Sequence, residues 1–72
     1  QKLYLRLPDM TGETFERMKN LLEIFSGSTP VLLYLTEKKQ TVRAPQSLWV
    51  QPVDLLLSEL ENLLGKGSVV LK

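Results

Sequence analysis

The chain contains neither cysteine nor histidine. Without cysteine it has no disulfide to hold it together, and without both residues the usual zinc ligands are missing. Its carboxylates are scattered along the sequence rather than paired or clustered. We therefore expect no metal and no cofactor, and a fold that depends on its apolar core alone.

The chain also lacks a marked excess of one charge. Nine Lys and Arg residues face eight Asp and Glu residues, and the signs are interspersed. Proteins that bind nucleic acid mainly through phosphates carry a clear basic excess, so we expect nucleic-acid contact to be weak or indirect. No apolar run approaches the roughly 18 residues of a membrane span, and no signal peptide is present. The expected location is the cytoplasm, without a membrane partner.

An initiator methionine, a polar tail and a linker are absent as well. The chain begins on the alternating pattern of Lys2–Leu7 and ends one residue after the apolar Val69–Leu71. These limits suggest one domain, residues 1–72, excised from a longer protein. Domains of this size bury only about 60% of their unfolded surface, so a small margin of stability is expected.

Two segments have the spacing of amphipathic helices. The first follows Thr11, a suitable N-cap residue, and Gly27 is its expected left-handed C-cap. The second opens with Pro52 at its first position and is capped by Gly65 or Gly67. Their apolar stripes consist of Phe15, Met18, Leu21, Leu22 and Phe25, and of Leu56, Leu57, Leu60, Leu63 and Leu64.

Strand patterns occupy Lys2–Leu7, Val31–Thr36, Thr41–Ala44 and Ser68–Leu71. The order β-α-β-β-α-β predicts a single mixed α/β (α+β) domain with a sheet of about four strands. Helices on opposite faces would make an incomplete Rossmann-like unit. Helices on one face would make a ferredoxin-like two-layer sandwich. The second strand is apolar on both sides, which favours the first arrangement.

No catalytic set is visible. The serines have no histidine to activate them. Asp9 and Asp54 stand beside a proline or a helix start, where turn and capping roles explain them. Gly65-Lys66-Gly67 follows a helix, whereas the phosphate loop precedes one. We therefore expect no enzymatic activity from this chain and no small-molecule ligand.

One candidate surface is the sheet face that a one-sided arrangement would leave open. It would carry Tyr4 and Tyr34 together with Arg6 and Arg43. Aromatic rings flanked by cations can bind single-stranded nucleic acid. The same residues can equally form cross-strand pairs covered by arginine stems, which the low net charge favours.

The other candidate surface is the irregular segment between Pro45 and Pro52. It contains Leu48, Trp49 and Val50, and Trp49 is the chain's one tryptophan. Tryptophan is enriched at interface hot spots, so this segment is expected to contact a partner. It could also offer an edge strand to an extended peptide. Alternatively, Trp49 plugs the edge of the core.

Several segments, in order and spacing, carry a resemblance that covers essentially the whole chain. They are Leu3–Leu7, Ser26–Val31, Leu33–Leu35, Val42–Pro45, Trp49–Pro52, Leu60–Gly65 and Val69–Leu71. Together they resemble the C-terminal module of the bacterial replicative DNA polymerase III alpha subunit of the DnaE type.

This resemblance implies a non-catalytic protein-interaction module of a DNA-directed DNA polymerase. In that family the polymerase aspartates, the PHP domain and the OB-fold module lie upstream, and no active-site residue corresponds to a position here. The end of the alpha subunit is implicated in binding the tau subunit of the clamp loader, which makes tau the expected partner. Two readings from other classes stay open: a small regulatory or ligand-binding ferredoxin-like domain, and a single-stranded nucleic-acid binder.

Overall fold

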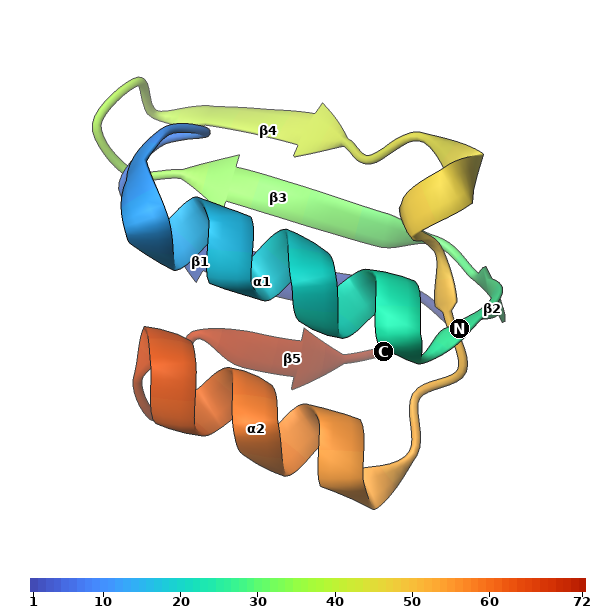
Figure 1. The fold of residues 1–72 in the computed structure, drawn as a ribbon. Helices are drawn as coiled ribbons and strands as arrows, with labels where there is room; N and C mark the ends of the chain where they lie inside the picture. The colour runs from blue at the N-terminus through green and yellow to red at the C-terminus, as the bar shows by residue number, and fades with distance from the viewer.

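A computed structural model describes residues 1–72. Four of its strands form one mixed sheet, as the sequence predicts, and their order in the sheet is β4-β3-β1-β5 (Figure 1). The elements in chain order are β1 (Leu3–Leu7), α1 (Gly12–Ile24), β2 (Ser26–Thr29), β3 (Val31–Leu35), β4 (Gln40–Arg43), the 3-10 helix η1 (Gln46–Leu48), α2 (Asp54–Leu64) and β5 (Val69–Leu71).

The sheet is built on one βαβ unit. β1 and β3 are parallel neighbours joined through α1, and β4 and β5 are antiparallel strands at the two edges. In the ferredoxin-like fold another strand separates the two strands of such a unit. The order found here keeps them adjacent, as in a Rossmann-like unit, and a hairpin and a returning edge strand complete a mixed four-stranded α+β sheet.

Both helices cover the same face of this sheet, and the other face is open (Figure 1). The expectation of helices on opposite faces is therefore wrong. It rested on Leu32, which is apolar on the side away from the core. Leu32 is half-buried because its cross-strand neighbours Tyr4 and Arg43 flank it, and no helix is needed to cover it.

The core lies between the sheet and the helix pair. The strand residues that face the helices are almost inaccessible to solvent, as are the inner stripes of both helices, and no charged or polar residue is buried with them. Among residues that are only partly buried, no inaccessible side-chain nitrogen or oxygen atom lacks a hydrogen-bond partner. The buried residues are Leu3, Leu5, Leu7, Phe15, Met18, Leu22, Val31, Leu33, Leu35, Ala44, Leu48, Val50, Leu56 and Leu60.

The exit from α1 differs from the prediction. α1 ends at Ile24 with Phe25 as its C-cap. Gly27 is not in the left-handed region, so its assignment as a left-handed cap is wrong. Gly27 is instead a point of close approach. A Cβ there would lie 2.5 Å from the backbone nitrogen of Gln51, and the Gly27 N–H donates to the carbonyl of Trp49 at 3.0 Å. Only glycine lets these two stretches meet.

The start of α2 also differs, whereas its end agrees with the sequence. Val53 is the N-cap and the helix begins at Asp54, so Pro52 lies before the helix and not at its first position. Gly65 is the C-cap at a φ of 102°, and its N–H donates to the carbonyl of Glu61 at 2.8 Å. Thr11 is the N-cap of α1, although its side chain makes no capping hydrogen bond.

The two chain ends lie side by side (Figure 1). The N–H of Lys2 donates to the carbonyl of Lys72 at 2.6 Å, and the N–H of Lys72 donates to the carbonyl of Lys2 at 2.9 Å. These bonds extend the β1–β5 ladder beyond its assigned ends. Because side chains alternate along strands, Lys2 and Lys72 project on the same face as Tyr4.

Candidate functional site

The acidic side chains are spread over the surface of the domain. No three Asp or Glu residues gather where they could hold a metal ion. No helix is both long and apolar enough to span a membrane. The candidate sites are therefore surfaces defined by exposed apolar, aromatic and charged side chains.

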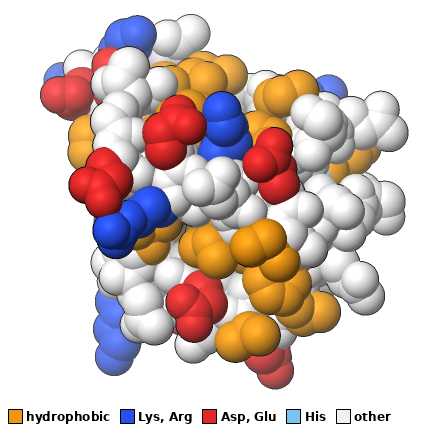
Figure 2. Space-filling view, viewed as in Figure 1, with side chains coloured by type: hydrophobic (Ala, Val, Ile, Leu, Met, Phe, Trp, Pro, Cys, Tyr) orange, Lys and Arg blue, Asp and Glu red, His pale blue; other side chains and the backbone are white.

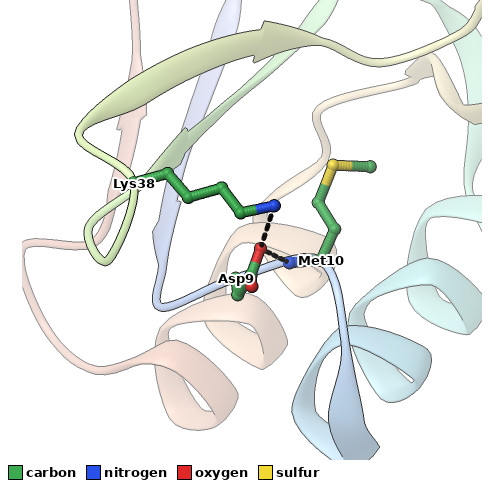
Figure 3. A network of polar contacts seen from close by, with 3 residues as sticks. All are labelled: Asp9, Met10 and Lys38. Atoms are coloured by element: carbon green, nitrogen blue, oxygen red, sulfur yellow. Dashed lines mark hydrogen bonds and ion pairs between the residues drawn. The ribbon is translucent and has the colours of Figure 1, made fainter.

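Asp9 is a structural residue in the turn after β1. Its Oδ1 accepts a hydrogen bond from the Met10 N–H at 2.7 Å and lies 3.6 Å from the Nζ of Lys38 (Figure 3). Lys38 belongs to the turn between β3 and β4. The carboxylate thus connects two loops at one end of the sheet.

The segment between Pro45 and Pro52 contributes two apolar side chains to the core. Leu48 is 7% exposed and Val50 is fully buried, so neither side chain is accessible to a partner. Trp49 is half-buried, and its Nε1–H donates to the carbonyl of Ala44 at 3.2 Å. Of the three residues singled out from the sequence, only Trp49 presents surface.

The backbone of this segment is also largely occupied. Val50 pairs with both ends of β2, at Ser26 and Thr29. The N–H of Gln51 donates to the carbonyl of Phe25 at 2.8 Å. These bonds leave few free donors or acceptors for the addition of an extended peptide.

The four residues of the other candidate surface lie together on the open face. Register places Arg6 beside Tyr34 on neighbouring strands, and Leu32 lies between Tyr4 and Arg43. A shallow depression of about 180 Å³ opens among Tyr4, Arg6 and Tyr34. The Arg6 Nη2–H donates to the carbonyl of Gly67 at 3.5 Å, which draws the guanidinium toward β5.

A third surface, which the sequence reasoning missed, is a groove between α1 and α2. Its volume is about 420 Å³, and its lining residues are Arg17, Asn20, Leu21, Ile24, Glu59, Asn62 and Leu63. Ile24 is 71% exposed and Leu55, one turn before Glu59 on α2, is 60% exposed. Figure 2 shows hydrophobic side chains gathered on this side of the molecule. The available signal was the presence of Ile24 and Leu55 on otherwise polar helix faces.

Two curated proteins are similar to nearly the whole chain. The DNA polymerase III alpha subunit of Halalkalibacterium halodurans is 34% identical over 97% of the chain, and that of Bacillus subtilis is 37% identical over 83% of it. The chain is homologous to a segment of DNA polymerase III alpha subunits. This confirms the resemblance on which the sequence interpretation rests.

The chain spans only a small part of these relatives. It covers 6% of the length of the first and 5% of the second. No family model matches the chain. No solved structure matches it either.

Proposed function

We propose that the chain is a non-catalytic, C-terminal protein-interaction module of a replicative DNA polymerase III alpha subunit, acting in the bacterial cytoplasm. The observation that carries this proposal is the similarity of nearly the whole chain to alpha subunits. The absence of any grouped carboxylates is consistent with it, because nucleotidyl transfer needs carboxylates that hold metal ions. DNA synthesis then belongs to the rest of the much longer subunit.

The partner we propose is the tau subunit of the clamp loader, and the surface is the groove between α1 and α2. An apolar floor with a polar rim is the usual anatomy of an interface. Leu21 and Leu63 supply the floor, and the exposed Ile24 extends it. A groove between two packed helices suits the apolar face of a third helix, which would bury side chains that are now in water.

The charged rim of the groove sets a further condition on the partner. Arg17 and Glu59 both line it, so the groove offers one cation and one anion to a docked segment. The Arg17 guanidinium already lies 2.8 Å from the Glu13 carboxylate. We therefore expect the affinity to come mainly from apolar burial, with a modest dependence on salt.

The experiment measures binding of tau from the source organism to the immobilised chain. Ile24→Ser and Leu55→Ser remove exposed apolar groups and should leave the fold intact. Each should weaken binding by about tenfold or more, because interface energy is concentrated in a few well-buried apolar residues. Val70→Ser is the matched control, since Val70 is exposed on the open sheet face. It should change the affinity less than twofold.

Two results would count against this proposal in different ways. A parent chain that does not bind tau at all would rule out tau as its partner. Weakening by Trp49→Phe, with no effect of Ile24→Ser or Leu55→Ser, would place the binding surface on the segment between Pro45 and Pro52 instead. Trp49→Phe suits this purpose because it keeps an aromatic plug and removes only the Nε1–H that bonds to Ala44.

A ligand-binding role is the weaker alternative. Small-molecule sites are concave and bring a few polar groups together over an apolar lining. Both depressions of this surface are shallow and open to solvent, and the strand order is not ferredoxin-like. No observation favours that class.

A further inference from the structure

The near-neutral net charge hides a separation of charge between the two sides of the domain. Six of the eight acidic residues belong to α1 and α2, and only two of the nine basic residues do. The helical acids are Glu13, Glu16, Glu23, Asp54, Glu59 and Glu61. The basic residues therefore lie mainly on the sheet and its loops.

Four of these basic residues lie on the open sheet face, and none of them has an acidic partner. Arg6 lies on β1 and Arg43 on β4, and the paired ends of the sheet add Lys2 and Lys72. None of the four forms an ion pair. The strands carry no acid at all, and of the two acids outside the helices, Asp9 is paired with Lys38. All charged side chains of the strands are therefore positive, which favours binding of a polyanion to this face.

Between these cations lie two aromatic rings. Tyr34 is 39% exposed, and register places it next to Arg6. Tyr4 is half-buried, with the Nζ of Lys72 5.5 Å from its ring centroid. Exposed rings on a flat sheet are surfaces on which unpaired bases stack, because every base has an apolar π-face.

We propose that the open sheet face, formed by Tyr4, Tyr34, Lys2, Arg6, Arg43 and Lys72, binds single-stranded nucleic acid. The cations contact successive phosphates, and the ring of Tyr34 stacks on a base. Single strands are favoured over duplexes because the bases of a duplex already stack on one another. They are favoured over acidic protein segments because carboxylates alone leave the exposed ring without a partner.

This binding is weak on its own, since four cations and two rings make a small site. It adds to the affinity of a longer protein through the high effective concentration that a covalent connection provides. The face lies on the opposite side of the domain from the helical groove, so this inference can fail while the proposed interaction with tau holds.

The test is fluorescence anisotropy of a labelled oligothymidylate of about 20 nucleotides, titrated with the 72-residue chain. With four phosphate contacts on a single strand, the affinity should fall about 50-fold between about 50 and about 200 mM salt. Arg6→Gln combined with Arg43→Gln removes two contacts. The same salt change should then lower the affinity only about sevenfold, and binding at low salt should be at least about tenfold weaker.

A matched control removes the same charge from the other side. Arg17→Gln combined with Lys19→Gln takes two cations from α1, and it should leave the affinity within twofold of the parent. If Arg6→Gln disturbs the fold through its bond to Gly67, Lys2→Gln combined with Lys72→Gln tests the same face. Thermal melting of each variant checks that it stays folded.

Tyr34→Ser separates base stacking from charge. It leaves all four cations in place and should weaken binding by about fivefold or more. An unchanged affinity in Tyr34→Ser, or displacement of the oligonucleotide by polyglutamate as readily as by unlabelled oligothymidylate, would overturn the proposal in favour of an acidic protein partner. Stronger competition by a duplex than by a single strand, or equal weakening in the α1 control, would overturn it too.

Discussion

The two sides of this domain differ in almost every surface property, although they share one core. The helical side is acidic and contains an apolar groove lined in part by the exposed Ile24, and Leu55 is exposed one turn before Glu59, another lining residue. The sheet side is not covered by a helix, is basic and presents two tyrosines beside a shallow depression. Summed over the chain the charges nearly cancel, so the net charge describes neither side. A small domain that exposes two such unlike faces has room for two different partners.

The largest expected effects come from the core that both sides share. Leu33→Ala on the sheet and Leu60→Ala on α2 each remove a fully buried side chain. Each should lower the free energy of unfolding by about 2–5 kcal/mol, through lost burial and the cavity left behind. Urea denaturation measures the change. Leu55→Ala, which truncates an exposed leucine of the same helix, is the control and should change it by less than about 0.5 kcal/mol.

A difference between Leu33→Ala and Leu60→Ala in the loss of unfolding free energy would show how firmly each side of the domain is packed. Losses of about 2–5 kcal/mol in both variants mean that the helices and the sheet are both firmly packed in the shared core. A loss below about 1 kcal/mol in Leu60→Ala would mean that α2 is held loosely, and the groove would then not be a preformed site.

The next effect concerns the connection between the two halves of the chain. Gly27→Ala places a methyl group 2.5 Å from the backbone nitrogen of Gln51, where only a backbone shift can relieve the clash. We expect a loss of about 1–3 kcal/mol, as for other overpacked sites. Ser28→Ala, at the exposed neighbour, is the control for the same denaturation measurement. A neutral Gly27→Ala would show that β2 and the segment around Val50 can separate at little cost.

A smaller effect, an increase in stability, tests whether charge repulsion on the acidic helical side destabilises the domain. The last turn of α1 has no basic residue, and Glu23 places a negative charge near the negative end of the helix dipole. Glu23→Lys should therefore raise the free energy of unfolding by about 0.3–1 kcal/mol at low salt. The gain should shrink in high salt, because screening weakens interactions between exposed charges. A loss of stability would show that the acidic surface is not repulsive at that point.

The smallest expected effect is no effect at all. The chain should incorporate no nucleotide on a primed template with Mg²⁺, and stoichiometric Mg²⁺ or Zn²⁺ should not shift its melting temperature. The reason is that no cluster of ligands exists to hold either ion. A clear shift would reveal a metal site that neither side of the domain shows.

The sequence predicts the sheet, the helices and most of the core because each depends on local periodicity. Alternation places Leu33 inside, and helical spacing does the same for Leu60. The start of α2 was harder to predict. Pro52 suits a first helical position, but the chain makes one more turn there, in which the Val53 N–H donates to the carbonyl of Gln51. Gly27 was misread because a close approach between distant segments leaves no mark on local spacing.

The surfaces were less predictable than the fold. Whether α2 lies on the same face of the sheet as α1 depends on the packing of the two helices against each other, and the groove exists only because of that packing. Trp49 and its neighbours looked like a partner site because they are apolar and irregular in sequence. In three dimensions Leu48 and Val50 complete the core. Apolar residues outside regular elements do not reveal from sequence alone whether they face inward.

The mutual hydrogen bonds of Lys2 and Lys72 make this domain a good subject for circular permutation. A short glycine-rich linker can join the two ends without disturbing the sheet, because their backbones already touch. New ends can then be opened in the exposed turn that contains Lys39. A permuted chain of this kind would begin with β4 and finish with β3, yet every strand would keep its neighbours. Its folding rate, compared with that of the parent, would report whether forming the β1–α1–β3 unit limits the reaction.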